Sequence, residues 1–227
     1  GHARRARGGR MDGLEIAPVV CLIGRRRHER TGRRIVDGYW RRHALRADRL
    51  ARALATDTGA PEGWSWQPDT SSRTAAALGF RRPPLPYLNE PHRPAKGRCV
   101  VCGRPIFRFG WHCDLWGDGQ PNTRASWHAC CVVAYRLWIM PSEFLKPLAA
   151  RQRRLCPITG ERLRGAGEVD HRIPLFRVWR EFRGTAWPDV LGFWGAPNLQ
   201  VLSRTAHREK CAREARDRRM TASLEPV

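Results

Sequence analysis

Two stretches near the carboxyl end of the chain decide its fold. The first is Glu168-Val-Asp-His-Arg-Ile-Pro-Leu175, and the second is Trp194-Gly-Ala-Pro-Asn-Leu-Gln-Val-Leu-Ser-Arg-Thr-Ala-His-Arg-Glu-Lys-Cys211. Residues 167–173 and 199–202 predict two short strands, and the polar run after them predicts a helix that ends near residue 215. We expect the strands to pair as a hairpin and the helix to pack across it.

The side chains on these stretches suit phosphodiester hydrolysis. An Asp-His pair at the end of a strand places an anionic oxygen beside a group that titrates near neutral pH. If the helix crosses the hairpin, Asp170 and His207 can share one divalent cation, and His171 points toward a bound phosphate. Hydrolysis of a phosphodiester needs an activated water, a cation and a neutral imidazole, and this segment supplies the residues for all three.

The order of three motifs resembles that of the HNH endonuclease family. The motifs are Asp-His-Arg-Ile-Pro, Asn-Leu-Gln-x-Leu and His-x-x-Lys, within residues 156–215. The resemblance implies an α+β fold built on a ββα-metal finger, in which His171 is the general base and Asp170 and His207 hold the catalytic metal. It further implies that Asn198 braces the loop between the strands and that Lys210 contacts phosphate. The implied cofactor is Mg²⁺, Mn²⁺ or another divalent cation.

The sequence departs from one feature of many family members, which is a structural zinc held by two C-x2-C pairs. Cys156 is present, but Thr159, Ser203 and Ala206 occupy the other three positions. We therefore expect no zinc at this place and a buried Cys156. The finger must then be held together by packing of aromatic side chains. The candidates are Trp179, Phe182, Trp187, Phe193 and Trp194.

A second cluster of metal-ligand residues lies earlier in the chain. Cys99 and Cys102 form a C-x2-C pair, and His128 and Cys131 form an H-x2-C pair that opens a helix. Together they predict a tetrahedral Cys3His site for a structural zinc ion. Cys113 and Cys130 are competing ligands. The alternative is that Cys131 is only a buried apolar residue and that His128 only caps the helix.

The rest of the chain divides into regions by composition. Residues 1–95 form a basic, Arg-rich region with a Pro-rich linker over residues 58–94, and residues 96–150 form the small zinc-binding helical module. Residues 151–220 form the nuclease finger, and residues 221–227 are a tail. Helices are expected over residues 38–55, 125–140 and 142–155, the last with Ser142 as its N-cap. A buried strand is expected over residues 16–24.

The charge of the chain favours a polyanionic partner. Its 227 residues include 42 Lys and Arg against 21 Asp and Glu, which gives a net charge of +21. Double-stranded DNA is the expected partner, with Arg172, Arg204 and Arg208 as candidate contacts to its backbone. Residues 175–197 make a long insertion between the strands. Its Arg177, Arg180 and Arg183 either contact DNA or form the solvated face of a packing helix.

Three functions remain open at this point. The first is a metal-dependent DNA endonuclease, the second is a non-cleaving DNA-binding or scaffold protein with the same fold, and the third is a nuclease for RNA or single strands. No apolar run is long enough to cross a bilayer, and no secretion signal is visible. We therefore expect an intracellular, cytoplasmic protein of bacterial or phage origin, with no membrane partner and no small-molecule ligand. The sequence does not indicate an oligomeric state.

Overall fold

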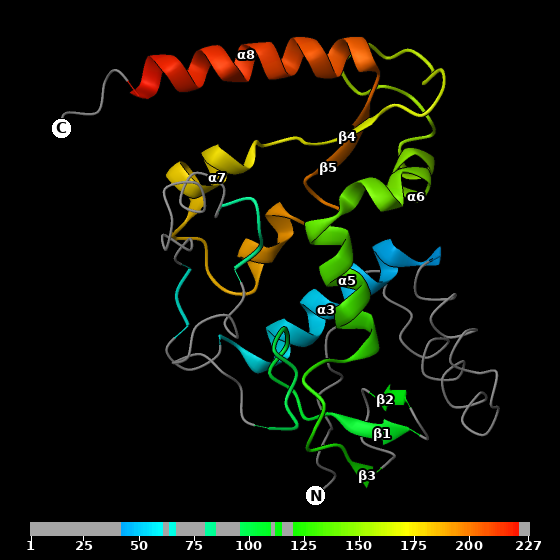
Figure 1. Cartoon of the computed structure of the whole chain (residues 1–227), viewed down its shortest axis with the longest axis vertical. Coiled ribbons are helices and arrows are strands. Elements are labelled where there is room, and N and C mark those ends of the chain that lie inside the picture. The colour runs from blue at the N-terminus through cyan, green and yellow to red at the C-terminus, as the bar shows by residue number, and fades with distance from the viewer. Residues whose placement is uncertain are drawn as a thin grey trace, which may run out of the picture.

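The computed structural model describes residues 42–60, 64–66, 80–84, 96–109, 112–114 and 120–222. Within these residues the chain is α+β, as predicted, with helices and two small antiparallel sheets (Figure 1). The strand expected over residues 16–24 and most of the Pro-rich linker lie outside the described residues. Among the described residues, no helix has both the length and the apolar composition needed to cross a lipid bilayer.

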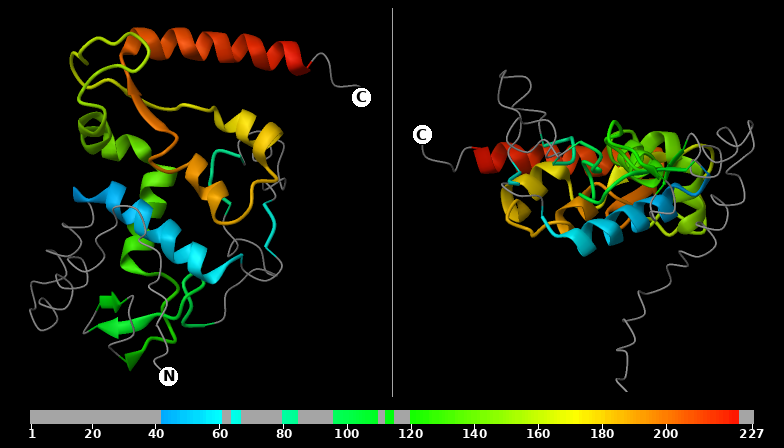
Figure 2. Two further views of the ribbon diagram at one scale, coloured as in Figure 1. Left: turned by 180° about the vertical axis from the view of Figure 1, so that it is seen from behind. Right: turned by 90° about the horizontal axis from the view of Figure 1, so that it is seen from below.

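The centre of the molecule is a pair of crossing helices, α3 (Ala44–Thr58) and α5 (Ala129–Ile139). α3 buries Ala47, Leu50 and Leu54 on one face, which is the helical spacing that the sequence predicts. α5 buries residues around most of its circumference, including Trp138. The two helices stay in contact in the views of Figures 1 and 2. This pair separates the three-stranded sheet at one end from α8 (Arg204–Ala222) at the other.

The three-stranded sheet lies beside the amino end of α5. Its strands are β1 (Phe107–Phe109), β2 (His112–Asp114) and β3 (Gln120–Pro121), in the order β2-β1-β3. A tight turn precedes it, in which the Gly103 N–H donates to the Cys99 carbonyl at 2.7 Å. Gly103 has a φ of 69°, a conformation that favours glycine. The turn folds Cys99 and Cys102 toward α5.

The helix expected over residues 142–155 is shorter than predicted and starts differently. Residues Pro141–Phe144 form the 3-10 turn η3, and α6 (Leu145–Arg151) follows. Ser142 therefore lies inside a helical turn, and the prediction that it is the N-cap was wrong. The physical reason is that Pro141, whose ring fixes φ near the helical value, starts the turn before Ser142.

The carboxyl-terminal half contains two antiparallel strands followed by a helix. β4 (Glu168–His171) pairs with β5 (Leu199–Leu202), and α8 begins two residues after β5. α8 reaches Ala222, about two turns beyond the expected end near residue 215, since no Pro or Gly interrupts it. Gly167, at φ 63°, leads into β4, where a Cβ would lie 2.8 Å from Val201 Cγ1.

The insertion between the strands folds as α7 (Leu175–Phe182) and the 3-10 helix η4 (Asp189–Phe193). Aromatic rings hold it in place, as predicted. Trp194 is fully buried, and Trp66 contacts Trp179 and Trp194 edge to face at centroid distances of 4.9 and 5.0 Å. Residues from all three of the larger regions expected from composition thus join one hydrophobic core.

Candidate functional site

The β4–β5 hairpin fixes the position of Asp170. Asp170 pairs with Gln200 across the two strands, and His171 pairs with Leu199. The Gln200 side chain donates to Asp170 Oδ2 at 2.9 Å.

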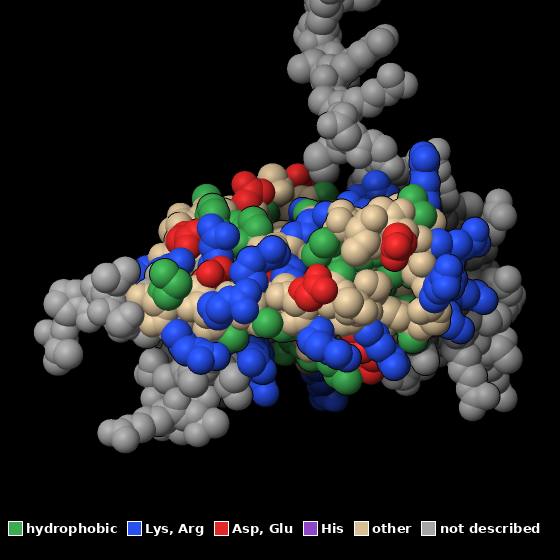
Figure 3. Space-filling view, turned by 90° about the horizontal axis from the view of Figure 1, so that it is seen from above, with side chains coloured by type: hydrophobic (Ala, Val, Ile, Leu, Met, Phe, Trp, Pro, Cys, Tyr) green, Lys and Arg blue, Asp and Glu red, His purple; other side chains and the backbone are tan. Residues whose placement is uncertain are grey.

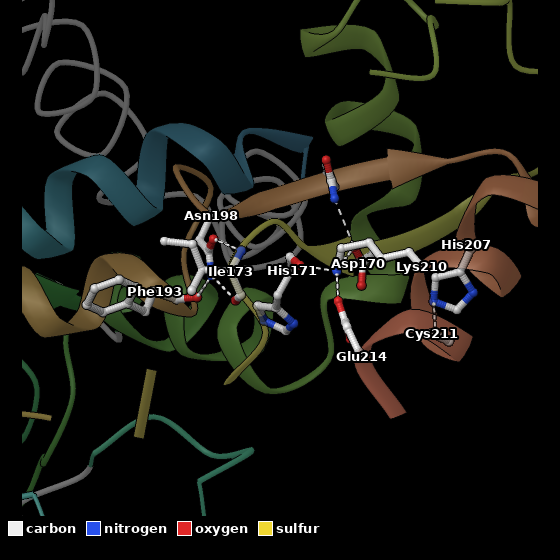
Figure 4. A network of polar contacts seen from close by, with 10 residues as sticks. Asp170, His171, Ile173, Phe193, Asn198, His207, Lys210, Cys211 and Glu214 are labelled. Carbon is white, nitrogen blue, oxygen red and sulfur yellow. Dashed lines mark hydrogen bonds and ion pairs between the residues drawn. The ribbon is translucent and has the colours of Figure 1, made fainter. Parts of the chain in front are cut away.

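Asn198 holds the chain just after His171. Its Nδ2 donates to the carbonyls of Ile173 and Phe193 at 2.9 and 2.8 Å, and its Oδ1 accepts from the Ile173 N–H at 2.8 Å. Its own carbonyl accepts from the Arg172 N–H at 2.7 Å. Figure 4 shows Asn198 between Ile173 and Phe193. This buried carboxamide uses both its donor and acceptor atoms, which is the bracing position that the family resemblance implies.

α8 carries the residues that face Asp170. Lys210 Nζ lies 2.8 Å from Asp170 Oδ2, donates to the His171 carbonyl at 2.8 Å, and pairs with Glu214 (Figure 4). His207 precedes Lys210 by three residues and therefore lies on the same face of the helix. Its Nε2 is 3.5 Å from Cys211 Sγ. The helix thus brings His207 to the side of the hairpin where Asp170 lies.

His171 has the electrostatic setting of a neutral imidazole. Its Nε2 is buried and has no hydrogen-bond partner among the described residues. Burial is the main cause that lowers the pKa of His171, the Asp170 carboxylate partly opposes it, and the Lys210 ammonium adds to it, so that the pKa lies at about 4. An unprotonated imidazole can accept a proton at neutral pH, and an unpaired buried nitrogen is satisfied when a water or ligand atom reaches it.

Asp170 and His207 suit a divalent cation in the chemistry of their donor atoms. Carboxylate oxygen and imidazole nitrogen are common ligands for such ions, and a site with few protein ligands leaves room for water and phosphate oxygens. Both polar contacts of Asp170 reach Oδ2, so Oδ1 accepts no hydrogen bond from the described residues. The donor set therefore fits a cation, although Lys210 already contacts the same carboxylate.

The four basic residues predicted to contact the backbone differ in exposure. Arg172, Arg204 and Arg208 are exposed, and Arg204 lies 3.7 Å from Glu168. Figure 3 looks onto α8 and shows basic side chains spread over this face, with fewer acidic ones. Lys210 is instead buried, and its ammonium contacts Asp170, Glu214 and the His171 carbonyl. The Lys210 ammonium is therefore bound by groups of the protein, and it is less available to a phosphate than the three exposed arginines are.

The arginines of the insertion are partly neutralised within α7. Arg177 and Arg180 both pair with Glu181, at 2.7 and 2.5 Å, and the two arginines lower the pKa of Glu181 to about 2. The Arg183 guanidinium lies 5.4 Å from the centroid of Trp179. These contacts favour the packing helix with a solvated arginine face over a dedicated DNA contact.

The predicted Cys3His residues come together in the structure. The ligand atoms of Cys99, Cys102, His128 and Cys131 all lie within 4.8 Å of one another, and all four residues are buried. His128 Nδ1 lies 3.2 Å from Cys102 Sγ, and His128 Nε2 lies 3.0 Å from the Pro105 carbonyl. A bond from Nε2–H to this carbonyl leaves Nδ1 free to bind a metal. The four residues can therefore hold a metal ion such as zinc.

The alternatives for this cluster do not match the geometry. His128 occupies the N-cap position of α5 but makes no side-chain cap hydrogen bond. Cys130 is buried next to Cys131, yet it is not among the four grouped ligands. The side chain of Cys113 lies outside the described residues. The cysteines whose side chains the structure describes are all free thiols, so none of them forms a disulfide.

The thiols of the cluster share their protons unequally. Burial raises the pKa of the Cys99 thiol, but hydrogen bonds from Cys102, Cys131 and His128 outweigh burial and hold it well below its usual value. Burial and the neighbouring thiols raise the pKa of Cys131. A bound cation would stabilise all three cysteines as thiolates, because zinc binds the deprotonated form of cysteine.

Cys156 lies at the position where the family resemblance would place one ligand of a second zinc site. It is fully buried, as predicted, next to Thr159 and Ser203. Burial raises the pKa of its thiol, but backbone hydrogen bonds from Ser203, Thr159 and Ile158 outweigh burial and bring the pKa to about 7. In the described residues, Cys99, Cys102, His128 and Cys131 are the one group of three or more candidate ligands.

Sequence reasoning missed Asp48, which connects the centre of the molecule to this site. Asp48 is fully buried, and its carboxylate accepts from Trp138 Nε1 at 2.5 Å and from the Ala196 N–H at 3.1 Å. A Cβ on Gly195 would lie 2.5 Å from Asp48 Oδ1. The one feature of the sequence that could have indicated a buried role for Asp48 is its place as an acidic residue among the arginines of an amphipathic helix.

Comparison with known proteins adds no relative. A scan against models of protein families matched none, and searches of curated proteins and of solved structures found no match. A function can therefore be inferred from the residues of the site and their geometry.

Proposed function

We propose that this chain is a metal-dependent endonuclease of the HNH type that hydrolyses phosphodiester bonds in duplex DNA. The observation that carries the proposal is the joint arrangement of the hairpin and α8. Asn198 fixes the backbone after His171, Gln200 and Lys210 hold Asp170, and the helical spacing of Lys210 and His207 turns His207 toward the same carboxylate. Chance would rarely place these residue types in this order and on these elements together.

In the proposed reaction, His171 accepts a proton from the attacking water at its unpaired Nε2, which the depressed pKa keeps unprotonated at neutral pH. Asp170 and His207 would hold the divalent cation, which supplies positive charge to the phosphate oxygens when it is bound. Lys210 orients Asp170 and the His171 backbone together. Asn198 keeps His171 at the end of β4.

The charge of the chain supports DNA as the substrate class. The excess of 42 basic over 21 acidic residues favours a polyanion, and the arginines at 172, 204 and 208 are exposed near the hairpin. The Cys99, Cys102, His128 and Cys131 cluster has, in our proposal, a structural zinc ion. A zinc ion with four protein ligands has no open position for a substrate water.

The test is incubation of supercoiled plasmid with the purified protein and Mg²⁺, Mn²⁺, Ni²⁺ or Zn²⁺. We expect nicking or linearisation that needs an added metal and disappears in His171→Ala. The matched control is His43→Ala, which removes an exposed imidazole from the start of α3. Cleavage that persists in His171→Ala would contradict the role of His171.

One observation favours a second function, a DNA-binding protein that does not cleave. The Lys210 ammonium contacts Oδ2 of Asp170 and so already supplies a positive charge to the carboxylate that would hold a metal. In this case the protein would bind the plasmid without nicking it under any metal. Cleavage of RNA or single-stranded DNA alone would instead support the third function.

A further inference from the structure

A hollow of about 240 Å³ lies between α3, α6 and the loop that leads into β5. Its lining residues are Leu45, Arg49, Arg52, Arg151, Ala196 and Pro197. Leu45, Arg49 and Arg52 are spaced to lie on one face of α3, and Arg151 is the last residue of α6. Three guanidinium groups from two helices therefore face one space.

Within the part of the chain that the structure describes, acidic side chains match the positive charge around this hollow only in part. Arg49 and Arg151 have no ion pair in the described part of the chain, and Arg151 donates to the Ala196 carbonyl at 2.5 Å. Arg52 lies 3.5 Å from Asp48, but its Nε is buried without a hydrogen-bond partner. Among the described residues, Asp48 is the one carboxylate that pairs with any of the three arginines, and it is already bonded to Trp138 and Ala196.

The arginines also act on one another. Burial lowers the pKa of Arg151, and the nearby charges of Arg172, Arg49 and Arg52 lower it further, against the opposing effect of Asp48. Three positive charges held near one carboxylate repel one another and destabilise the folded chain, and a bound anion would reduce this repulsion. Arginine forks bind phosphate oxygens through two parallel hydrogen bonds.

The hollow adjoins the proposed active site. Pro197 lines it and also lines a second hollow of about 250 Å³, which includes Arg172 and Asn198. Arg172 directly follows His171, and its N–H donates to the Asn198 carbonyl. A polyanion held at His171 and Arg172 would therefore continue past Pro197 toward the three arginines.

We propose that Arg49, Arg52 and Arg151 form a binding pocket for a backbone phosphate of duplex DNA, outside the phosphate that is cleaved. This inference rests on the proposed function, because it takes DNA as the substrate. The volume is several times the roughly 30 Å³ that one water occupies in the liquid, so a phosphate fits together with some water. The pocket would set the path of the DNA backbone across α3 and α6.

The test measures binding without cleavage. A short fluorescent duplex is titrated by anisotropy into His171→Ala protein without added divalent cation, over a range of salt concentrations. Adding Arg49→Gln and Arg151→Gln should weaken binding about tenfold, and should make the dependence of log K on log salt shallower by about one. The matched control is Arg104→Gln with Arg136→Gln, which removes the same charge from two arginines that are ion-paired elsewhere.

Two further variants distinguish a lost phosphate contact from misfolding. Arg49→Gln alone removes an exposed side chain without an ion pair and should weaken binding in the same direction, by less. Arg49→Lys with Arg151→Lys keeps the charge and should largely restore the salt dependence. Circular dichroism of each variant checks the fold.

The outcomes separate this inference from the proposed function. Unchanged affinity and salt slope in the double Gln variant would overturn the pocket, whether or not wild-type protein cleaves plasmid. Loss of affinity in that variant would support the pocket even if wild-type protein cleaves nothing. Absence of duplex binding, or an equal loss in the control, would overturn it. Binding of inorganic phosphate alone, with duplex affinity unchanged in the variant, would show a small-anion site and also overturn it.

Discussion

At the scale of single residues, Asn198 is the side chain whose geometry matters most to the site. It is buried, and its carboxamide makes three hydrogen bonds to backbone groups of Ile173, just before the insertion, and of Phe193, near the end of the insertion. Each of these backbone groups would be left without a partner if the side chain were removed. Such groups are costly to leave unpaired inside a protein.

We predict that Asn198→Ala lowers the free energy of unfolding by about 2 kcal/mol and reduces plasmid nicking more than stability alone explains. The reason is that the backbone at Ile173, two residues after His171, loses its fixed position. Asn198→Asp is the informative comparison, because it keeps the acceptor for the Ile173 N–H but loses the two bonds to carbonyls. Urea denaturation and nicking rates measure both effects. An Asp variant with wild-type stability would contradict this role.

His171 gives a second prediction, on the pH dependence of stability. Its pKa of about 4 in the folded chain lies below the usual histidine value of 6.5, so between these values the unfolded chain binds more protons than the folded chain. The free energy of unfolding should therefore fall as pH is lowered from about 6.5 to about 4, by at most about 3 kcal/mol from this group. The change should be absent in His171→Gln. The measurement is urea denaturation of both proteins across this range, without added divalent cation. Identical slopes in both proteins would contradict it.

At the scale of elements, the edge of the small hairpin is covered by one side chain. Gln152, the residue after α6, donates to the Val201 carbonyl at 2.6 Å and accepts from the Val201 N–H at 2.9 Å. It thus pairs with β5 as a neighbouring strand would. A two-stranded sheet is marginal alone, and an unpaired edge invites association, so this bond attaches the hairpin to α6.

We predict that Gln152→Ala lowers the free energy of unfolding by about 1 to 2 kcal/mol, because both backbone groups of Val201 lose a buried partner. Hydrogen exchange at the Val201 amide should become faster. Gln152→Glu keeps the acceptor but not the donor, so it should protect the Val201 amide while still losing stability. Unchanged exchange in the Ala variant would show that other groups cover this edge.

The elements also show what the sequence could predict. The bounds of β5 agree with the predicted strand over residues 199–202, and β4 lies within the predicted range over residues 167–173, because β5 is mainly apolar and both stretches lie between turn formers. The Cys3His cluster could be predicted because the spacing of its residues in the sequence is typical of metal ligands. The contacts of Asp48 with Ala196 and of Gln152 with Val201 join residues 148 and 49 positions apart, and no local pattern encodes them. The pocket of Arg49, Arg52 and Arg151 could not be predicted for the same reason, since its arginines come from separate segments of the chain.

At the scale of the whole molecule, a continuous path of contacts connects the Cys3His cluster to the hairpin. His128 and Cys131 lie at the start of α5, and Trp138 lies near its end. Trp138 donates to Asp48 on α3, and Asp48 accepts from Ala196, two residues before Asn198. α5 and α3 therefore transmit the position of the cluster to the loop that positions Asn198.

We predict that Cys99→Ser abolishes zinc binding, measured by elemental mass spectrometry, and lowers the free energy of unfolding by about 3 kcal/mol or more, because metal binding supplies folding free energy. Cys130→Ser is the matched control, since Cys130 is equally buried on α5 but is not one of the four ligands. It should keep one zinc and most of the stability.

The same variant tests the path of contacts to the hairpin. In Cys99→Ser, hydrogen exchange at the Ala196 amide should become faster and plasmid nicking should fall, although no residue of the hairpin has been changed. Zinc at wild-type stoichiometry in Cys99→Ser that resists chelators would contradict the site. Loss of zinc without any change at Ala196 would show that the cluster stabilises only its own end of the molecule, and that the hairpin is held by the aromatic packing around Trp194 alone.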